Sequence, residues 1–187
     1  VNTDNFFGTY EITNTLIEKG HTKIAFVGNL NLTSSIQDRF LGYYKSILEY
    51  KLPFKDSWII KDRTDDSVWI DITLPEDMPT AFVCNCDKTA LILIQKLESC
   101  GYKIPEDYSV VGFDDSIHAM QSIPTISTVR VDLEEMARVS VKMISKKTKD
   151  IRTQYGRVMI KGDLVIRNST RKQKIDNKII IQTKYSN

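Results

Sequence analysis

The chain has 187 residues, of which 41% are hydrophobic and 27% charged, with a net charge of +2. This composition is typical of globular proteins, and every apolar run falls short of the ~20 residues needed to cross a bilayer. Residues 171–187 hold five Lys or Arg against one acid, so residues 1–170 are slightly acidic. They lack the basic footprint of a DNA-contacting surface. Cys84, Cys86 and Cys100 lack metal-ligand spacing, which predicts a reduced, cytoplasmic chain with no metal site and no cofactor.

Apolar residues recur with helical spacing in some segments and form short buried runs in others, which predicts alternating helices and strands. Helices are expected over 5–19, 35–50 and 88–100, with a weaker one over 68–74, and strands over 23–28, 57–61, 80–84 and 108–113. Ser35 and Asp38 are expected to form a capping box, and Asp87 to cap the helix that follows it. This order predicts an α/β fold, a Rossmann-like parallel sheet with helices on both faces.

The pattern changes after residue 115. A loop is expected over 116–124, a β-rich segment over 126–131, a helix with one apolar face over 133–147 and a strand over 157–166. In the basic tail, residues 179–181 are three isoleucines, which predict an edge strand or a partner contact.

Two adjacent carboxylates, Asp114 and Asp115, end the buried stretch PEDYSVVGFDD (105–115). In open α/β sheets, ligands bind beyond the carboxyl ends of the strands. Asp114 is therefore the leading candidate for a ligand contact, because both carboxylate oxygens accept hydrogen bonds from hydroxyl or NH groups. The alternative is a turn-forming or helix-capping aspartate, and Asp115 is assigned mostly to the turn.

Seven segments follow one another in an order that is more specific than any of them alone. They read VNTDN (1–5), LIEKGHTKIAFVG (16–28), DRFLGY (38–43), PTAFVCNCDKTA (79–90), IPEDYSVVGFDD (104–115), PTISTVRVD (124–132) and GDLVIRNST (162–170). Together they resemble the C-terminal part of the effector-binding core of the LacI/GalR family of bacterial transcription regulators.

The resemblance implies one lobe of a two-lobe, periplasmic-binding-protein-like core that clamps an effector. Residues 1–128 would form the C-terminal lobe, 129–163 would return to an N-terminal lobe missing here, and 164–171 would add a final strand, followed by the basic tail 172–187. The DNA-binding headpiece is expected to be missing too. Without its usual sheet, the helix over 133–147 is expected to be mobile or to pack on another copy.

The resemblance also implies effector-binding residues. Arg39 lies where the family carries an arginine that reaches into the cleft; the alternative is a surface ion pair of little energetic value. Cys86 lies where the family usually has an asparagine, and a thiol is the weaker hydrogen-bonding group. Either the ligand differs, or Asn85 compensates, or the site has lost sensitivity. Phe113 is a candidate stacking platform, with core packing as the alternative.

The expected function is effector sensing and dimerisation in a cytoplasmic, DNA-binding transcription regulator, a repressor, rather than an enzyme. Its effector would be a sugar, sugar phosphate, nucleoside or purine, and operator DNA would be bound only through the absent headpiece, with no membrane partner. By resemblance, a homodimer would form through Leu91, Gln95, His118 and Ile123.

Two other functions remain as alternatives. A solute-binding protein of a transporter shares the two-lobe fold, but the reduced-looking cysteines argue against it. A flavodoxin-like enzyme could use Asp114 and Asp115, although adjacent residues at a strand end point to different sides. Of the two tryptophans, Trp58 or Trp69 is a candidate to face the pocket.

Overall fold

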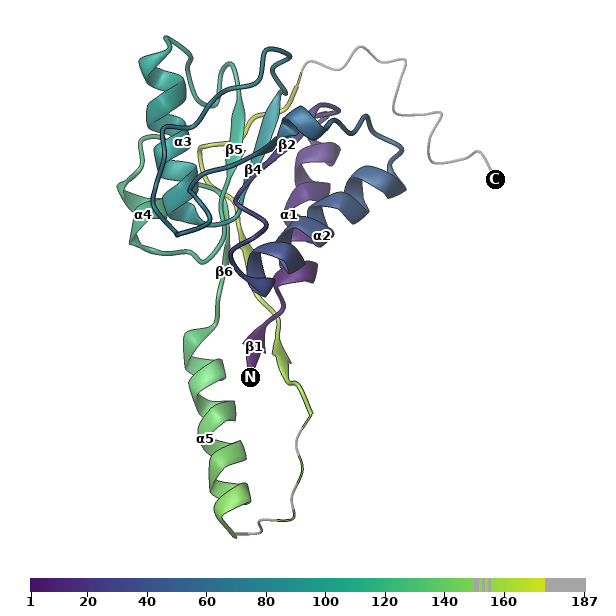
Figure 1. The fold of residues 1–187 in the computed structure, drawn as a ribbon, viewed down its shortest axis with the longest axis vertical. Coiled ribbons are helices and arrows are strands. Elements are labelled where there is room, and N and C mark those ends of the chain that lie inside the picture. The colour runs from purple at the N-terminus through teal and green to yellow at the C-terminus, as the bar shows by residue number, and fades with distance from the viewer. Residues whose placement is uncertain (150–151, 153, 155, 174–187) are drawn as a thin grey trace.

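A parallel sheet of four strands is the centre of the computed structural model, which describes residues 1–149, 152, 154 and 156–173 (Figure 1). The strand order is β3-β2-β4-β5. The strands are β2 (Ile24–Val27), β3 (Ile59–Ile60), β4 (Ala81–Cys84) and β5 (Ser109–Val111). A parallel bridge between Val111 and Ser127 extends the sheet toward β6 (Thr128–Arg130), which pairs antiparallel with β8 (Asp163–Val165).

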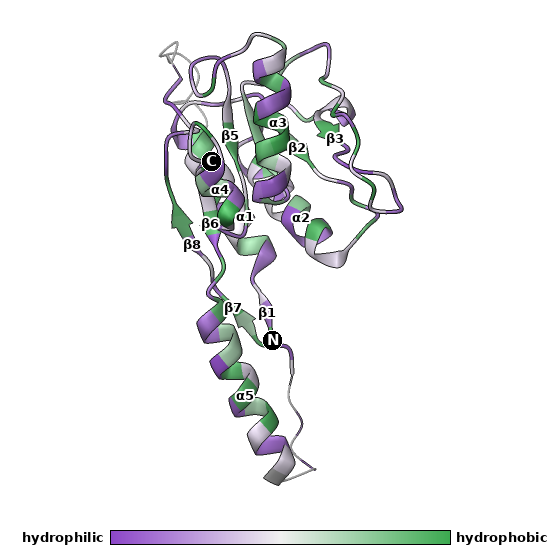
Figure 2. Ribbon diagram, turned by 90° about the vertical axis from the view of Figure 1, so that its left-hand side faces the viewer, coloured by the Kyte–Doolittle hydropathy of each residue, from purple (hydrophilic) through white to green (hydrophobic). Residues whose placement is uncertain are grey.

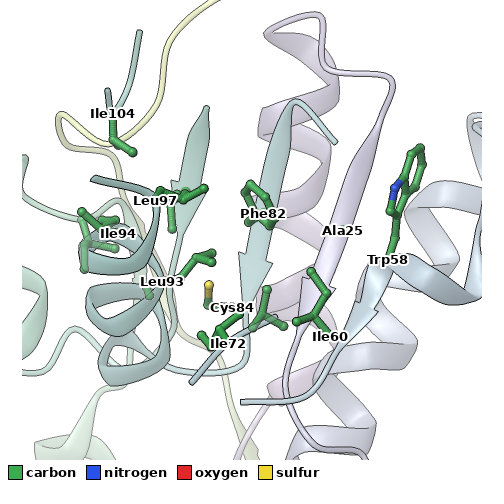
Figure 3. Packing of buried hydrophobic residues seen from close by; sticks show 14 of the residues in the cluster. Ala25, Trp58, Ile60, Ile72, Phe82, Cys84, Leu93, Ile94, Leu97 and Ile104 are labelled. Atoms are coloured by element: carbon green, nitrogen blue, oxygen red, sulfur yellow. The ribbon is translucent and has the colours of Figure 1, made fainter. Parts of the chain in front are cut away.

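Helices cover both faces of this sheet. α1 (Asn5–Glu18) and α2 (Ser34–Glu49) share one core with Phe26, whereas α3 (Asp87–Ser99) and α4 (Ile117–Gln121) share the other with Val27. Neighbouring residues of a strand point to opposite faces, so a strand covered on both sides reads as a continuous apolar run. Figure 3 shows the second core, where Leu93 and Leu97 lie beside Phe82. The predicted fold class is confirmed.

The connection between β3 and β4 is the main departure from the predicted order. Residues 61–80, all of which the structure describes, form no helix, so the expected helix over 68–74 is wrong. Arg63 and Trp69 instead form an antiparallel bridge around a turn in which Ser67 has a φ of 65°. Ile72 is buried in the core that α3 covers. The β-branched residues at 68, 70, 72 and 73, followed by Pro75, disfavour a helix here.

Local details also differ from the prediction. Thr33, not Ser35, caps α2 by accepting a hydrogen bond from the Ile36 amide. Cys86, not Asp87, is the N-cap residue of α3. The loop over 116–124 contains α4, and residues 56–58 form a 3₁₀ turn (η1, Asp56–Trp58) before β3.

The strand expected over 157–166 is two short strands. β7 (Met159–Ile160) pairs parallel with β1 (Asn2–Thr3), and β8 begins after Gly162. A Cβ atom on Gly162 would lie 2.7 Å from Val129 Cγ1 and 2.8 Å from the Arg130 carbonyl oxygen. The glycine is therefore required by the close approach of the two chain segments.

α5 (Leu133–Lys149) extends away from the sheet as an arm (Figure 1). Hydrophobic residues recur along it (Figure 2), and Leu133, Val141 and Ile144 are all exposed. The sequence predicts that this helix is mobile or packs on another copy of the chain. Burial of α5 against the rest of the same chain would have contradicted that prediction, and such burial is not observed. Apart from Met136, which is half-buried beside Thr3, the apolar face therefore lacks a cover within the described part of the chain.

Two expectations concern other parts of the chain. The isoleucines at 179–181 lie outside the described residues. Among the described residues, no helix combines the length and apolarity that a membrane span requires.

Candidate functional site

Polar side chains gather where the parallel strands end. Asp62 follows β3, Asn85 and Cys86 follow β4, and Asp114 follows β5. The strands are parallel and in register, so their carboxyl ends meet along one edge of the sheet. α2 brings Arg39 to the same edge. This is the position at which open α/β sheets bind ligands.

Arg39 is held by three different acceptors and one aromatic ring. Its Nε donates to Asn5 Oδ1 at 2.8 Å, its Nη2 donates to Asp114 Oδ1 at 3.0 Å and its Nη1 donates to the Asn85 carbonyl. The guanidinium carbon lies 3.8 Å from the centroid of the Phe113 ring. The side chain is 12% exposed. Arg39 is therefore a fixed element of the site rather than a surface residue paired with its neighbour.

Asp114 is the exposed partner of this pair, with 38% of its side chain accessible. Its backbone has a φ of 106°, which non-glycine residues rarely adopt, and its amide donates to the Val129 carbonyl at 2.8 Å. Burial raises the pKa of the Asp114 carboxyl, and the charge and hydrogen bond of Arg39 offset part of this rise. One carboxylate oxygen is paired with Arg39, and the group still reaches the solvent.

Phe113 and Asn85 lie beneath the site rather than in it. Phe113 is buried and supports the Arg39 guanidinium. The buried Asn85 amide nitrogen donates to the Val27 carbonyl, to Asp62 Oδ2 and to Thr89 Oγ1. These bonds occupy the amide inside the protein, which argues against Asn85 as a substitute for the usual asparagine.

Cys86 lies beside the cationic side chain of Arg63. Its partly exposed Sγ lies 3.9 Å from Arg63 Nη2 and 3.3 Å from Thr89 Oγ1, while Arg39 reaches the preceding carbonyl of Asn85. The thiol therefore occupies the middle of the edge, between the Arg39–Asp114 pair and Arg63.

A second cluster, built on Asp62, was not predicted. Asp62 is fully buried and accepts hydrogen bonds from the Asn29 amide, Asn85, Thr89 and Arg63. Burial alone would raise its pKa, but the bonds from Arg63, Thr89 and Asn85 outweigh burial, and the pKa lies below its ordinary value. The buried charge is therefore compensated.

Arg63 connects this cluster to an aromatic side chain. Its guanidinium carbon lies 4.1 Å from the centroid of the Trp69 ring, and Lys88 Nζ lies 4.5 Å from the same ring. Trp69 is partly exposed, whereas Trp58 is fully buried, so Trp69 is the tryptophan at the edge. The one signal for Arg63 in the sequence was its place just after a predicted strand.

Asp87 supports the site from below. Its carboxylate accepts bonds from the Ser116 amide at 2.7 Å and from Thr128 Oγ1 at 2.5 Å. Burial raises its pKa to about 6, against the opposing effect of these bonds. Asp87 thus joins α3 both to the turn after Asp114 and to β6.

The edge offers a partly exposed carboxylate, ordered guanidinium donors, a thiol and an aromatic ring. Such a set suits recognition of a polar small molecule by hydrogen bonds. In the described ranges, no three His, Cys, Asp or Glu side chains are grouped so as to hold a metal ion. The fold and the site define a parallel α/β domain with a polar cluster at the carboxyl edge of its sheet.

Comparison with known proteins agrees with this class. The family model described as "periplasmic binding protein-like domain" matches residues 13–170. The HTH-type transcriptional repressor PurR of Haemophilus influenzae (strain PittEE) is 33% identical over 177 residues, covering 89% of this chain and 52% of that protein. PurR of Vibrio parahaemolyticus is 30% identical over 169 residues, covering 88% of this chain and 51% of that protein.

Solved structures show the same fold. The complex of the transcriptional regulator CelR with cellobiose has a TM-score of 0.76 at 25% identity, covering 89% of this chain and 52% of that one. A LacI-family regulator of Enterococcus faecium with bound ribose has a TM-score of 0.75 at 23% identity, covering 92% and 65%.

The chain belongs to the periplasmic binding protein-like domain family. Its resemblance to the effector-binding region of LacI/GalR regulators is confirmed. The chain spans about half the length of the curated relatives it matches.

Proposed function

We propose that this chain is the effector-sensing part of a cytoplasmic, DNA-binding transcription regulator, and that a polar small molecule binds at the carboxyl edge of the sheet. The observation that carries the proposal is the Arg39–Asp114 pair. A fixed guanidinium holds one oxygen of a carboxylate that is still partly open to solvent. Such a pair offers a donor and an acceptor in a fixed geometry, which suits hydroxyl or ring NH groups.

A second lobe would complete the clamp. This part of the proposal is supported by the exposed apolar face of α5 and by the relatives, which are about twice as long. Residues 129–163 would reach that lobe and 164–171 would return from it. A ligand that binds both lobes favours the closed arrangement, and closure would be passed to a DNA-binding headpiece.

The effector class is proposed as a sugar, sugar phosphate, nucleoside or purine. Known relatives of this fold include a complex with cellobiose and one with ribose, and the curated relatives include PurR and an arabinose metabolism repressor. Repressors among the relatives favour a regulator over a transporter component. Cys86 in place of an amide predicts that the ligand differs from those of the relatives at that contact.

The face formed by α3 and α4 is proposed as a homodimer interface. Ile123 is 86% exposed, and Ile117 and Met120 of α4 are exposed beside it. Gln95 is exposed, while Leu91 and His118 are half-buried. An apolar surface of this kind suits an isologous two-fold contact. Ile123→Glu should convert a dimer into a monomer in analytical ultracentrifugation; an unchanged dimer would refute this interface.

Calorimetric titration of the full-length protein with ribose, cellobiose, arabinose, hypoxanthine and guanine tests the proposed function. Saturable binding of one of them, together with a change in DNA affinity, is the expected result. Turnover of the bound compound would instead favour the flavodoxin-like enzyme.

A further inference from the structure

The sequence assigns Asp115 to a turn, but its carboxylate makes more bonds than a turn requires. It is 9% exposed, and each of its oxygens is bonded to a different arginine. Oδ2 accepts from Arg130 Nε at 2.7 Å, and Oδ1 accepts from Arg167 Nη2 at 2.6 Å. Burial alone would raise the pKa of Asp115, but the two arginines outweigh burial and hold it below its ordinary value.

The two arginines lie at the ends of the two paired strands over which the chain leaves and re-enters this lobe. Arg130 ends β6, the strand that leads to α5. Arg167 follows β8, the returning strand, and also donates from Nη1 to the Ile126 carbonyl at 2.9 Å. One carboxylate therefore joins both crossing strands.

The same residue is adjacent to the proposed ligand contact. Asp114 and Asp115 have φ values of 106° and 53°, so two successive non-glycine residues adopt the left-handed region. Residues in such conformations persist only where the surrounding structure holds them. The bonds of Asp115, together with the Asp114 amide bond to Val129, provide that restraint.

We propose that Asp115 is the positioning residue of the site. Through Arg130 and Arg167, it fixes both crossing strands to the turn that contains Asp114. A displacement of Asp114 is then passed to β6 and β8 together rather than absorbed by the turn. This inference rests on the proposed function for the identity of Asp114 as the ligand contact. The mechanical link itself needs no ligand, so it can be tested separately.

Amide hydrogen exchange of the 187-residue chain, measured by NMR, provides the test. Three hydrogen-bonded amides report on the turn and the two strands: Asp114, Val131 and Arg167, which donate to Val129 O, Asp114 O and Ser127 Oγ. In Asp115→Asn, all three should exchange about tenfold faster, because the loss of charge weakens both arginine bonds. Gly28 and Asn85, whose amides donate within the main sheet, should change less than twofold.

Asp77→Asn is the matched control, because Asp77 also joins two cationic side chains, Lys23 and Lys55, but lies away from the site. It should leave the three reporters unchanged. Arg167→Gln is the second variant, and adding Asp115→Asn to it should accelerate the reporters by clearly less than tenfold, because only the Arg130 bond is then left to weaken. Equal acceleration of the sheet amides, or acceleration of one reporter alone, would overturn the proposal. Absence of any ligand response would contradict the proposed function but not this link.

Discussion

Replacing Arg39 by lysine should lower the free energy of unfolding by about 2 to 3 kcal/mol. The guanidinium donates hydrogen bonds to Asn5 Oδ1, to the Asn85 carbonyl and to Asp114 at once. The first two acceptors belong to buried residues. An ammonium group is a single point and cannot reproduce the planar fork. Leaving one buried acceptor unpaired costs about 1–3 kcal/mol, and loss of the stacking on Phe113 adds about 0.5 kcal/mol.

Equilibrium unfolding in urea, followed by circular dichroism, measures this difference. Arg157→Lys is the matched control, because Arg157 is 57% exposed and, among the described residues, bonds to Asp38 alone, at 3.3 Å. Exposed ion pairs contribute little, so the control should stay within about 0.5 kcal/mol of the wild type. A loss in Arg39→Lys no larger than in the control would show that the guanidinium is not fixed, and the argument for a preorganised site would fail.

Three further variants test what stabilises the fold. Burial lowers the pKa of His21 to about 4 from 6.5, so the stability that the neutral ring contributes is lost as the pH falls from 6.5 to 4, by up to about 3 kcal/mol. The stability contribution of Asp87 depends on pH in the opposite direction. Its pKa is raised from 3.8 to about 6, so this contribution is lost as the pH rises through that range. In urea unfolding between pH 4 and 6.5, the stability of His21→Gln relative to the wild type should therefore fall with rising pH, and that of Asp87→Asn should rise. If the stability of both variants ran parallel to that of the wild type over this range, both pKa shifts would be contradicted. A Cβ atom on Gly42 would lie 2.1 Å from the Phe6 carbonyl oxygen, so Gly42→Ala should cost about 2 kcal/mol where α1 meets α2, and Gly156→Ala, which meets nothing within 4 Å, should cost much less.

The sheet and its helices could be predicted because their signals are local. Continuous apolar runs bounded by polar residues identified β2, β4 and β5, and helical spacing identified α1, α2 and α3. Asp114 could be located because a strand end is visible in the sequence, and the ligand-binding role proposed for it follows from a general rule. Arg39 needed the family resemblance, since a helical arginine next to an aspartate is otherwise an ordinary surface pair.

The remainder of the site depends on contacts between distant segments. Arg63 and Trp69 lie in a stretch without periodicity, and only the tertiary fold brings Arg63 to Asn85 and Cys86. The role of Asp115 depends on Arg130 and Arg167, which are 15 and 52 residues away. The cap of α2 was missed by two positions, because Thr33, Ser34 and Ser35 are all suitable caps and the local sequence does not rank them.

We propose that Asp114 and Arg39 together bind a small-molecule effector. The most direct test is calorimetry of the full-length protein with the compound that binds the wild type, comparing Asp114→Asn with Asp163→Asn, an exposed aspartate of β8. We predict that Asp114→Asn weakens binding at least 30-fold, about 2 kcal/mol for a lost charge-assisted hydrogen bond, while Asp163→Asn binds as the wild type does. Equal affinity in Asp114→Asn and the wild type would contradict the claim.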